Sequence, residues 1–254
     1  MTPIDESFGE LLVPFPAWIS LDVPFDRAIR IVHETCDIVT GGYKAHASVE
    51  DALKQKLGKL RRAGAEKIWW DRKADDVAST VAEIGKTAVY CGVDRMTVHA
   101  AGGIEMMMAA VAHGPREIVA VTDLTSLEKA EIGMRGGMPV DASTLLKAHW
   151  AKLAGVSHLV CSCEEVGMLN RRRGHSKIAN RGLELHGLTF VVPGSRTITT
   201  DMGSQKRSTT APEALKNGAD ELVLGSEVCN ADYPREALLK IYAAVATSRA
   251  ASSV

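Results

Sequence analysis

Residues 67–85 read KIWWDRKADDVASTVAEIG and contain one complete unit of a strand followed by a helix. Lys67 to Trp70 is a short apolar run of the kind that favours extended backbone in a buried strand. Asp75 to Gly85 has the spacing of apolar residues that is typical of an amphipathic helix. This stretch therefore predicts a strand that stops just before Asp71 and a helix that begins a few residues later.

The same alternation continues on both sides of this unit. Further strands are expected within residues 17–21, 37–44, 96–100, 118–122, 158–161, 188–192 and 221–224, and further helices at 24–34, 48–63, 103–113, 141–154, 164–172, 211–217 and 234–248. Glycines at positions 64 and 218 are good stop signals for two of these helices. Strict alternation of strands and helices implies a parallel sheet.

Eight such units in 254 residues fit a closed (β/α)8 TIM barrel of the α/β class. We expect a single barrel domain over residues 1–254, with residues 1–16 as an N-terminal extension. A doubly wound sheet is the alternative that the periodicity leaves open.

Composition narrows the classes of function. The net charge of −1 gives no reason to expect nucleic acid or an anionic membrane as a partner. The chain has no apolar run of about 18 residues and no signal peptide at its start, so we expect a cytoplasmic protein without a membrane span. Its five cysteines have irregular spacing, which indicates free thiols in a reducing compartment, and they lack the paired spacing of a zinc site.

The charged motif D-x-K-x-x-D stands directly after the strand of the opening unit. Asp71 and Lys73 are two residues apart, so strand geometry points their side chains to the same side, and Asp76 follows about one helical turn later. Taken alone, this motif is also compatible with an exposed loop in which Asp75 or Asp76 caps the next helix.

Polar residues also follow the other expected strands. Chemistry in barrels of this kind takes place at the carboxyl ends of the strands. The residues at or just beyond these ends include Asp22, Lys44, Asp71, Lys73, His99, Asp123, Ser126, Cys161, Ser162, Pro193, Arg196, Gly225 and Ser226. Three carboxylates and two lysines would then face one cavity, a concentration of charge that indicates a functional site.

These motifs, taken in order, resemble the orotidine 5′-monophosphate decarboxylase family. The matching segments are SLD at 20–22, YKAH at 43–46, DRKADD at 71–76, VHAAGG at 98–103, LTSL at 124–127, VCS at 160–162, VPGSR at 192–196 and DMGSQKRSTT at 201–210. The resemblance covers residues 19–228 and is highly specific for the superfamily, although less so for the substrate.

The resemblance implies a decarboxylase without metal or cofactor that converts orotidine 5′-monophosphate to uridine 5′-monophosphate in pyrimidine synthesis. Lys44, Asp71, Lys73 and Asp76 would form an alternating charge network, in which Lys73 stabilises and protonates a carbanion. Asp22 would bind the ribose and Ser126 the pyrimidine. Asp76 and Thr80 would come from the neighbouring subunit, so the resemblance also implies a homodimer with shared sites and a nucleotide-like small molecule as substrate.

The region expected to bind the substrate phosphate departs from the family pattern. Family members usually have Gly-Arg at the end of the last strand, whereas this chain has Gly225 followed by Ser226. Gln205 matches a phosphate-contacting glutamine, and Arg207 stands in the same loop as a possible replacement cation. Pro193 and Arg196 are also expected to bind the substrate. Either the phosphate is bound differently, or the substrate is not a standard nucleotide monophosphate.

Three alternative functions follow. Sugar-phosphate decarboxylases and synthases of the superfamily share the D-x-K-x-x-D motif, but they use a glutamate near the position of Lys44 and a magnesium ion, so Lys44 argues against them. Ser226 favours a decarboxylase that acts on an altered, unphosphorylated pyrimidine carboxylate. The last alternative is a binding protein that has kept the fold without catalysis, and the complete charge network argues against it.

Overall fold

The computed structural model describes residues 15–123, 137–173, 185–196 and 209–252. Eight parallel strands form a closed barrel in the order β1-β10-β7-β6-β5-β4-β3-β2. They are β1 (Ala17–Ser20), β2 (Gly42–Ala45), β3 (Ile68–Ala74), β4 (Arg95–His99), β5 (Glu117–Val121), β6 (His158–Val160), β7 (Thr189–Pro193) and β10 (Glu221–Leu224). The expected (β/α)8 barrel is therefore confirmed, and the doubly wound alternative is wrong.

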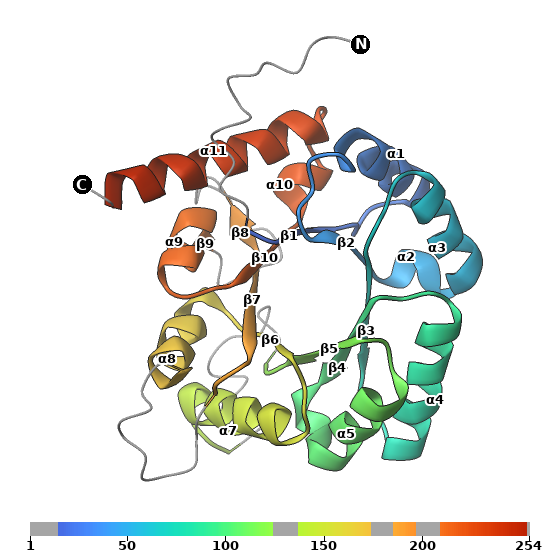
Figure 1. The fold of residues 1–254 in the computed structure, drawn as a ribbon, viewed down its shortest axis with the longest axis vertical. Helices are drawn as coiled ribbons and strands as arrows, with labels where there is room; N and C mark the ends of the chain where they lie inside the picture. The colour runs from blue at the N-terminus through green and yellow to red at the C-terminus, as the bar shows by residue number, and fades with distance from the viewer. Residues whose placement is uncertain (1–14, 124–136, 174–184, 197–208, 253–254) are drawn as a thin grey trace.

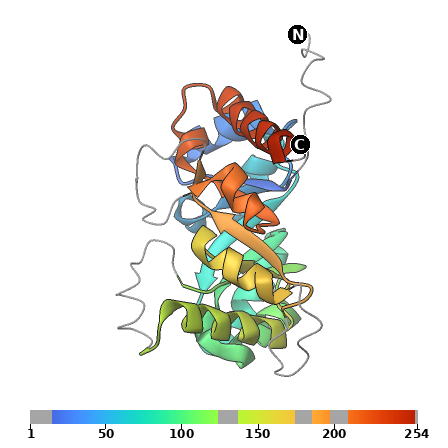
Figure 2. The same cartoon turned by 90° about the vertical axis from the view of Figure 1, so that its left-hand side faces the viewer.

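Helices surround the strands as an outer layer (Figures 1 and 2). They are α1 (Phe25–Thr35), α2 (Ala47–Glu50), α3 (Leu53–Arg62), α4 (Ala78–Tyr90), α5 (Gly103–His113), α7 (Val140–Leu153), α8 (Cys163–Arg173), α9 (Ala211–Lys216), α10 (Ser226–Cys229) and α11 (Pro234–Ser252), with a short 3-10 turn η2 (Ala100–Gly102). The long α11 packs beside α1, α9 and α10 and covers one side of the barrel. Two short strands, β8 (Ser195–Arg196) and β9 (Thr209–Thr210), pair outside the barrel.

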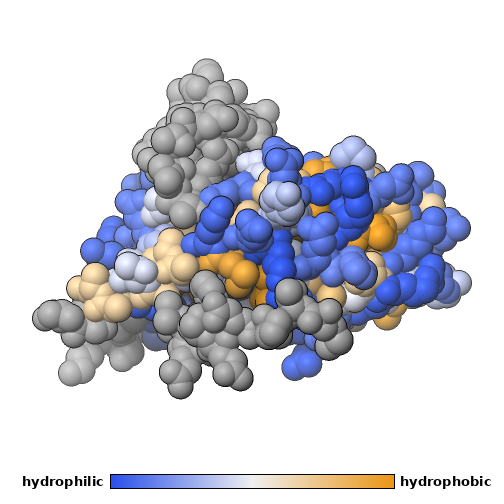
Figure 3. All heavy atoms as spheres, turned by 90° about the horizontal axis from the view of Figure 1, so that it is seen from above, coloured by the Kyte–Doolittle hydropathy of each residue, from blue (hydrophilic) through white to orange (hydrophobic). Residues whose placement is uncertain are grey.

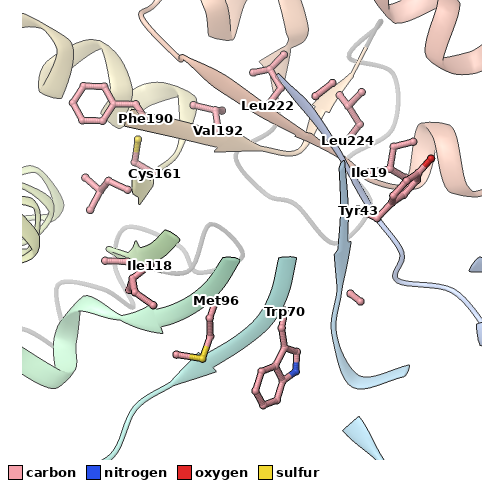
Figure 4. Packing of buried hydrophobic residues seen from close by; sticks show 14 of the residues in the cluster. Ile19, Tyr43, Trp70, Met96, Ile118, Cys161, Phe190, Val192, Leu222 and Leu224 are labelled. Atoms are coloured by element: carbon pink, nitrogen blue, oxygen red, sulfur yellow. The ribbon is translucent and has the colours of Figure 1, made fainter. Parts of the chain in front are cut away.

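The strands have two apolar faces because both the barrel interior and the helical layer need filling. Outward-facing residues such as Ile19, Met96 and Phe190 pack beneath the helices in the larger core (Figure 4). A smaller cluster fills the barrel itself and contains Trp18, Trp69, Val119, Val191 and Val223. The continuous apolar runs in the sequence reflect this burial on both faces, as the unbroken burial of β1 and β10 illustrates.

The amino-terminal end of the barrel is closed by buried charges that the sequence analysis did not identify. Arg95 donates hydrogen bonds to Glu117 and Glu221, at 2.7 and 2.5 Å, and its guanidinium lies 4.2 Å from the ring centroid of Trp18. His158 Nε2 lies 3.0 Å from an Arg95 nitrogen. Each charged group thus has a partner, which is the condition for burying it without a large penalty.

Three expected elements have other bounds in the structure, and one short helix was not expected. The helix expected at 48–63 is divided at Asp51 and Ala52 into α2 and α3, because Ala52 adopts a non-helical backbone conformation. The strand expected at 67–70 continues to Ala74, and the helix expected at 75–85 becomes α4 at 78–90. The short α10 was not expected at all.

The stop signal at Gly64 is confirmed. This glycine follows the end of α3 with a φ of 114°, in the left-handed region where a side chain would be strained.

Most of the N-terminal extension expected at 1–16 lies outside the described residues. On the face seen in Figure 3, hydrophobic residues form small patches within a mainly hydrophilic surface.

No helix among the described residues is long and apolar enough to cross a membrane.

Candidate active site

Two lysines share one buried carboxylate at the carboxyl ends of β2 and β3. Lys44 Nζ lies 2.5 Å from Asp71 Oδ2, and Lys73 Nζ lies 2.6 Å from the same oxygen. The Asp71 side chain is 6% exposed, whereas the two lysine side chains are 12% and 28% exposed. The structure therefore brings together three of the four residues that were expected to form the charge network.

The backbone at Lys73 explains how this contact forms. Lys73 has a φ of 49° and is the one residue other than glycine with positive φ in the described part of the chain. The pairing register between β3 and β4 shifts between Trp70 and Ala74, as expected for a bulged strand. Such a conformation costs about 1–3 kcal/mol, and such outliers are concentrated at functional sites.

The two lysines keep Asp71 ionised. Burial alone would raise the pKa of this carboxyl, but the charges of Lys44 and Lys73, together with the hydrogen bonds that they donate, hold its pKa well below the usual value. Asp71 therefore carries a negative charge at any pH at which the protein is expected to work.

Asp76 and Thr80 lie away from this cluster within the single chain. Both residues are exposed, and no ion pair within the described residues joins Asp76 to a lysine. Asp76 Oδ1 accepts a hydrogen bond from the backbone amide of Val77, but the N-cap residue of α4 is Val77, which has no side-chain cap. The interpretation of Asp75 or Asp76 as the helix cap is therefore wrong.

Asp22 lies at the exposed end of β1, beside the network. Ser20 Oγ donates a hydrogen bond of 2.6 Å to Asp22 Oδ2. Ser20 is in register with Lys44 on β2, so Asp22 follows the strand position that neighbours the lysine. This position leaves the second carboxylate oxygen of Asp22 available to a polar ligand at the carboxyl end of the barrel.

The remaining expected residues that the structure describes lie at or beyond the ends of β7 and β10, and β10 pairs with β1. Pro193 ends β7 in register with Val223 of β10, and Gly225 and Ser226 follow β10 at the start of α10. A Cβ atom built on Gly225 would meet no atom within 4 Å, so space is open at this position. Arg196 lies in β8, in register with Thr210, and its side chain is not described. Ser126, Gln205 and Arg207 lie outside the described residues.

Two histidines also lie at this end of the barrel, and one of them, His99, was expected there. Nδ1 of His46, two residues beyond Lys44, is buried without a hydrogen-bond partner among the described residues. His99, at the end of β4, is half-buried and lies within electrostatic reach of both Asp71 and Lys73. The sequence contained a signal for His46, because it shares the period-two spacing of Lys44, but its role was not assigned.

Among the described residues, no group of three or more His, Cys, Asp and Glu side chains is arranged to hold a metal ion. The five cysteines are free.

The fold and the lysine–aspartate network define a barrel enzyme whose charged groups gather at the carboxyl ends of its strands. A sequence profile of the orotidine 5′-phosphate decarboxylase / HUMPS family matches residues 17–241. The chain belongs to this family, and the expected resemblance is confirmed.

Individual relatives agree with this assignment. An orotidine 5′-phosphate decarboxylase of Anaeromyxobacter dehalogenans (strain 2CP-1 / ATCC BAA-258) is 32% identical over 234 residues, which cover 90% of this chain and 94% of the relative. One from Rhodopseudomonas palustris (strain BisA53) is 32% identical over 223 residues, covering 86% and 89%. The expected class of enzyme, a carboxy-lyase of the orotidine 5′-phosphate decarboxylase type, is thereby confirmed.

Solved structures support the fold. The orotidine 5′-phosphate decarboxylase of Lactobacillus acidophilus superimposes with a TM-score of 0.71 at 23% identity, over 91% of this chain and 99% of that chain. The orotidine 5′-monophosphate decarboxylase of Methanocaldococcus jannaschii, complexed with the inhibitor BMP, gives a TM-score of 0.71 at 17% identity, over the same shares.

Proposed function

We propose that the protein decarboxylates orotidine 5′-monophosphate to uridine 5′-monophosphate without a cofactor, as a step of pyrimidine synthesis. The single observation that carries the proposal is the shared carboxylate of Asp71, held between Lys44 and Lys73 at 2.5 and 2.6 Å. The family membership and the names of the curated relatives support the same reaction.

The chemistry requires a cation beside the carbon that loses its carboxylate. When the bond from the ring carbon to the carboxylate breaks, carbon dioxide leaves and the electron pair stays on the ring carbon. Lys73 then lies where its ammonium stabilises this negative charge and donates a proton to the carbon. The lysine becomes neutral in this step and regains its proton from solvent.

Asp71 acts in two ways in this mechanism. Its Oδ2 atom lies 2.6 Å from Lys73 Nζ and therefore holds the Lys73 ammonium in place. It also places a permanent negative charge near the substrate carboxylate, since its pKa is held well below the usual value. Two like charges 4 Å apart interact by about 4 kcal/mol at an effective dielectric near 20, so loss of carbon dioxide relieves an appreciable repulsion.

The complete site is proposed to require two copies of the chain. Asp76 and Thr80 are exposed in the single chain, on the segment that follows Lys73. This placement leaves both side chains available to a neighbouring molecule, in line with the homodimer that the family resemblance implies. We further propose that the enzyme works in the cytoplasm, where its five free thiols would stay reduced.

The binding of the remaining substrate groups is part of the same proposal. Asp22 would bind the ribose. Nδ1 of His46, which has no partner among the described residues, would be a second polar atom available to the substrate. Ser126 would contact the pyrimidine, while Gln205, Arg207, Pro193 and Arg196 would surround the phosphate beside Gly225. Ser226 favours a second candidate, decarboxylation of a related pyrimidine carboxylate without the phosphate, because a hydroxyl there supplies no positive charge.

The test is the loss of absorbance of orotidine 5′-monophosphate with the purified protein, with and without EDTA. Metal-independent turnover by the wild type, its loss in Lys73→Ala and its retention in the surface control Lys86→Ala would support the proposal. Lys86 is an exposed lysine of α4 paired with Glu83. Unchanged turnover in Lys73→Ala would refute the mechanism.

Absence of turnover in the folded wild type would reject the phosphorylated substrate. The unphosphorylated nucleoside would then be assayed by the release of carbon dioxide. Binding of either compound without release would indicate a non-catalytic protein.

A further inference from the structure

A groove lies on the outside of the barrel, between α1 and α3. The two helices pack beside each other (Figure 1), and the groove is bounded by the second half of α1 and the end of α3. Its volume is about 460 Å³. Pockets that bind small molecules typically have volumes of roughly 300–1,000 Å³, so the groove is large enough for such a ligand.

The groove lies away from the lysine–aspartate network of Asp71 and Lys73. In a barrel of this kind, each helix runs from the carboxyl end of one strand back towards the amino-terminal end of the next. The helix α1 ends at Thr35 before β2, and α3 ends at Arg62 before β3. The groove is therefore near the amino-terminal ends of the strands, where a ligand would not contact the candidate active site.

Positive charge is concentrated in this groove. Arg30 of α1 lines it together with Lys59 and Arg62 of α3, and Glu34 is the single carboxylate among the lining residues. Three cations against one carboxylate leave a local excess of two positive charges. The whole chain has 30 Lys and Arg against 31 Asp and Glu, so this excess does not follow from a basic composition. His33 also lines the groove and adds a hydrogen-bonding group.

The cations of the groove lack the partners that a neighbouring residue has. Arg61, on another face of α3, lies 2.6 Å from Asp94. In the described part of the chain, no ion pair or side-chain hydrogen bond engages Arg30, Lys59 or Arg62. Like charges three residues apart on a helix, such as Lys59 and Arg62, are unfavourable. An anion bound in the groove would supply the missing counter-charge.

The helix dipole explains only part of this arrangement. Cations are favoured in the last turn of a helix, which accounts for Lys59 and Arg62 on α3. Arg30 lies in the middle of α1, where the dipole has little effect. Its position across the groove from two further cations therefore needs another explanation, and binding of an anion provides one.

Apolar surface lies beside these charges. Ile29 of α1 and Ala63, which follows α3, both line the groove. Each is partly buried and packs against the larger core. An inorganic anion would leave this apolar surface in water, whereas an anion with an apolar or aromatic group would cover it.

We propose that the groove binds a small organic polyphosphate, such as a nucleoside diphosphate. Its phosphates contact Arg30, Lys59 and Arg62. Its base or other apolar portion covers Ile29 and Ala63. Guanidinium groups match phosphate oxygens in a bidentate manner, and the ammonium adds a compact point charge. Two linked phosphates carry enough negative charge to neutralise the local excess. This inference does not depend on the proposed function, because the groove shares no residue with the candidate active site.

Isothermal titration calorimetry of the full-length protein with ADP tests the inference. The combined variant Arg30→Gln, Arg62→Gln should bind ADP at least about tenfold more weakly, because the loss of one charged hydrogen bond already has an effect of that order. Arg116→Gln is the matched control, since Arg116 is an exposed arginine outside the groove, and it should leave the affinity unchanged. All three arginines are exposed, so the variants should fold, and their urea midpoints check this.

Unchanged affinity in the combined variant, or no binding of ADP to the wild type, would overturn the inference. Pyrophosphate should bind more weakly than ADP, because it leaves Ile29 and Ala63 uncovered; equal affinity would overturn the proposal of an organic ligand.

A variant of the candidate active site separates the two possible locations of the ligand. Lys73→Ala should leave the binding of ADP unchanged. Binding that is lost in Lys73→Ala but kept in the combined groove variant would place the ligand at the barrel mouth and refute the inference. Turnover of orotidine 5′-monophosphate does not enter these measurements, so the proposed function and this inference can fail separately.

Discussion

Replacement of Asp71 by asparagine tests the electrostatic basis of the site. The carboxylate accepts hydrogen bonds from two ammonium groups, at 2.5 and 2.6 Å, and its side chain is only 6% exposed. Asparagine has nearly the same shape but no charge. The variant therefore removes two attractions and leaves the ammonium groups of Lys44 and Lys73 facing each other without a counter-charge.

The size of the effect follows from this geometry. Removing one partner of a buried ion pair costs about 3–5 kcal/mol, because the charge that remains has lost both water and its partner. We expect a loss of that order in the free energy of unfolding for Asp71→Asn. Lys44→Met should cost less, about 1.5–3 kcal/mol, because it removes one charged hydrogen bond but preserves the pair between Asp71 and Lys73. Combining the two variants should recover part of the loss, because only one ammonium remains.

Urea unfolding at pH 7, followed by circular dichroism, measures these differences as shifts of the midpoint. The ranking is the decisive result: Asp71→Asn should be the least stable, and the combined variant should be more stable than it. If Asp71→Asn were as stable as the wild type, or more stable than Lys44→Met, the two lysines would not depend on this carboxylate. The reasoning would then be refuted.

Three further predictions concern the barrel away from the site. Burial alone would raise the pKa of Glu221, but the hydrogen bonds from His158 and Arg95 and the charge of Arg95 outweigh it and lower the pKa to about 2. The contribution of Glu221, about 3 kcal/mol, is therefore present above pH 4.5 and lost towards pH 2. Glu221→Gln should accordingly flatten the loss of stability between pH 5 and pH 3, and an unchanged slope in urea titrations would count against this account. Arg95→Met should lower the free energy of unfolding by about 3–5 kcal/mol, measured by urea, because it leaves Glu221 buried without its main partner. Gly85→Ala should lower the melting temperature, since a Cβ there would lie 2.9 Å from the backbone nitrogen of Gly114; a variant as stable as the wild type would show that α4 and α5 can separate freely.

The expected sequence of strands and helices was confirmed in its order, although several boundaries were wrong. Strands buried on both faces produce continuous apolar runs, and these runs are local signals that need no tertiary information. The boundaries of the strands also depend on tertiary contacts. β3 extends past Asp71 because its pairing with β4 resumes after a bulge, and the chain alone gives no sign of that pairing.

The candidate site was predictable to a similar extent. The spacing of Asp71 and Lys73 predicted that their side chains point to the same side, and the family resemblance implied that they act together. Their convergence with Lys44 on a single oxygen atom was not, because it depends on the closure of β2 against β3 and on the unusual backbone at Lys73.

The sequence by itself determined the class of fold and the identity of the main charged residues, because hydrophobic periodicity and the D-x-K-x-x-D spacing are properties of neighbouring positions. Only the tertiary structure placed Arg95, Glu117, His158 and Glu221 in one buried network, and only it joined Asp123 to Lys147. These residues lie far apart in the sequence. Their charges are tolerated in the interior because barrel closure brings each one to a partner. No local sequence pattern predicts these long-range contacts.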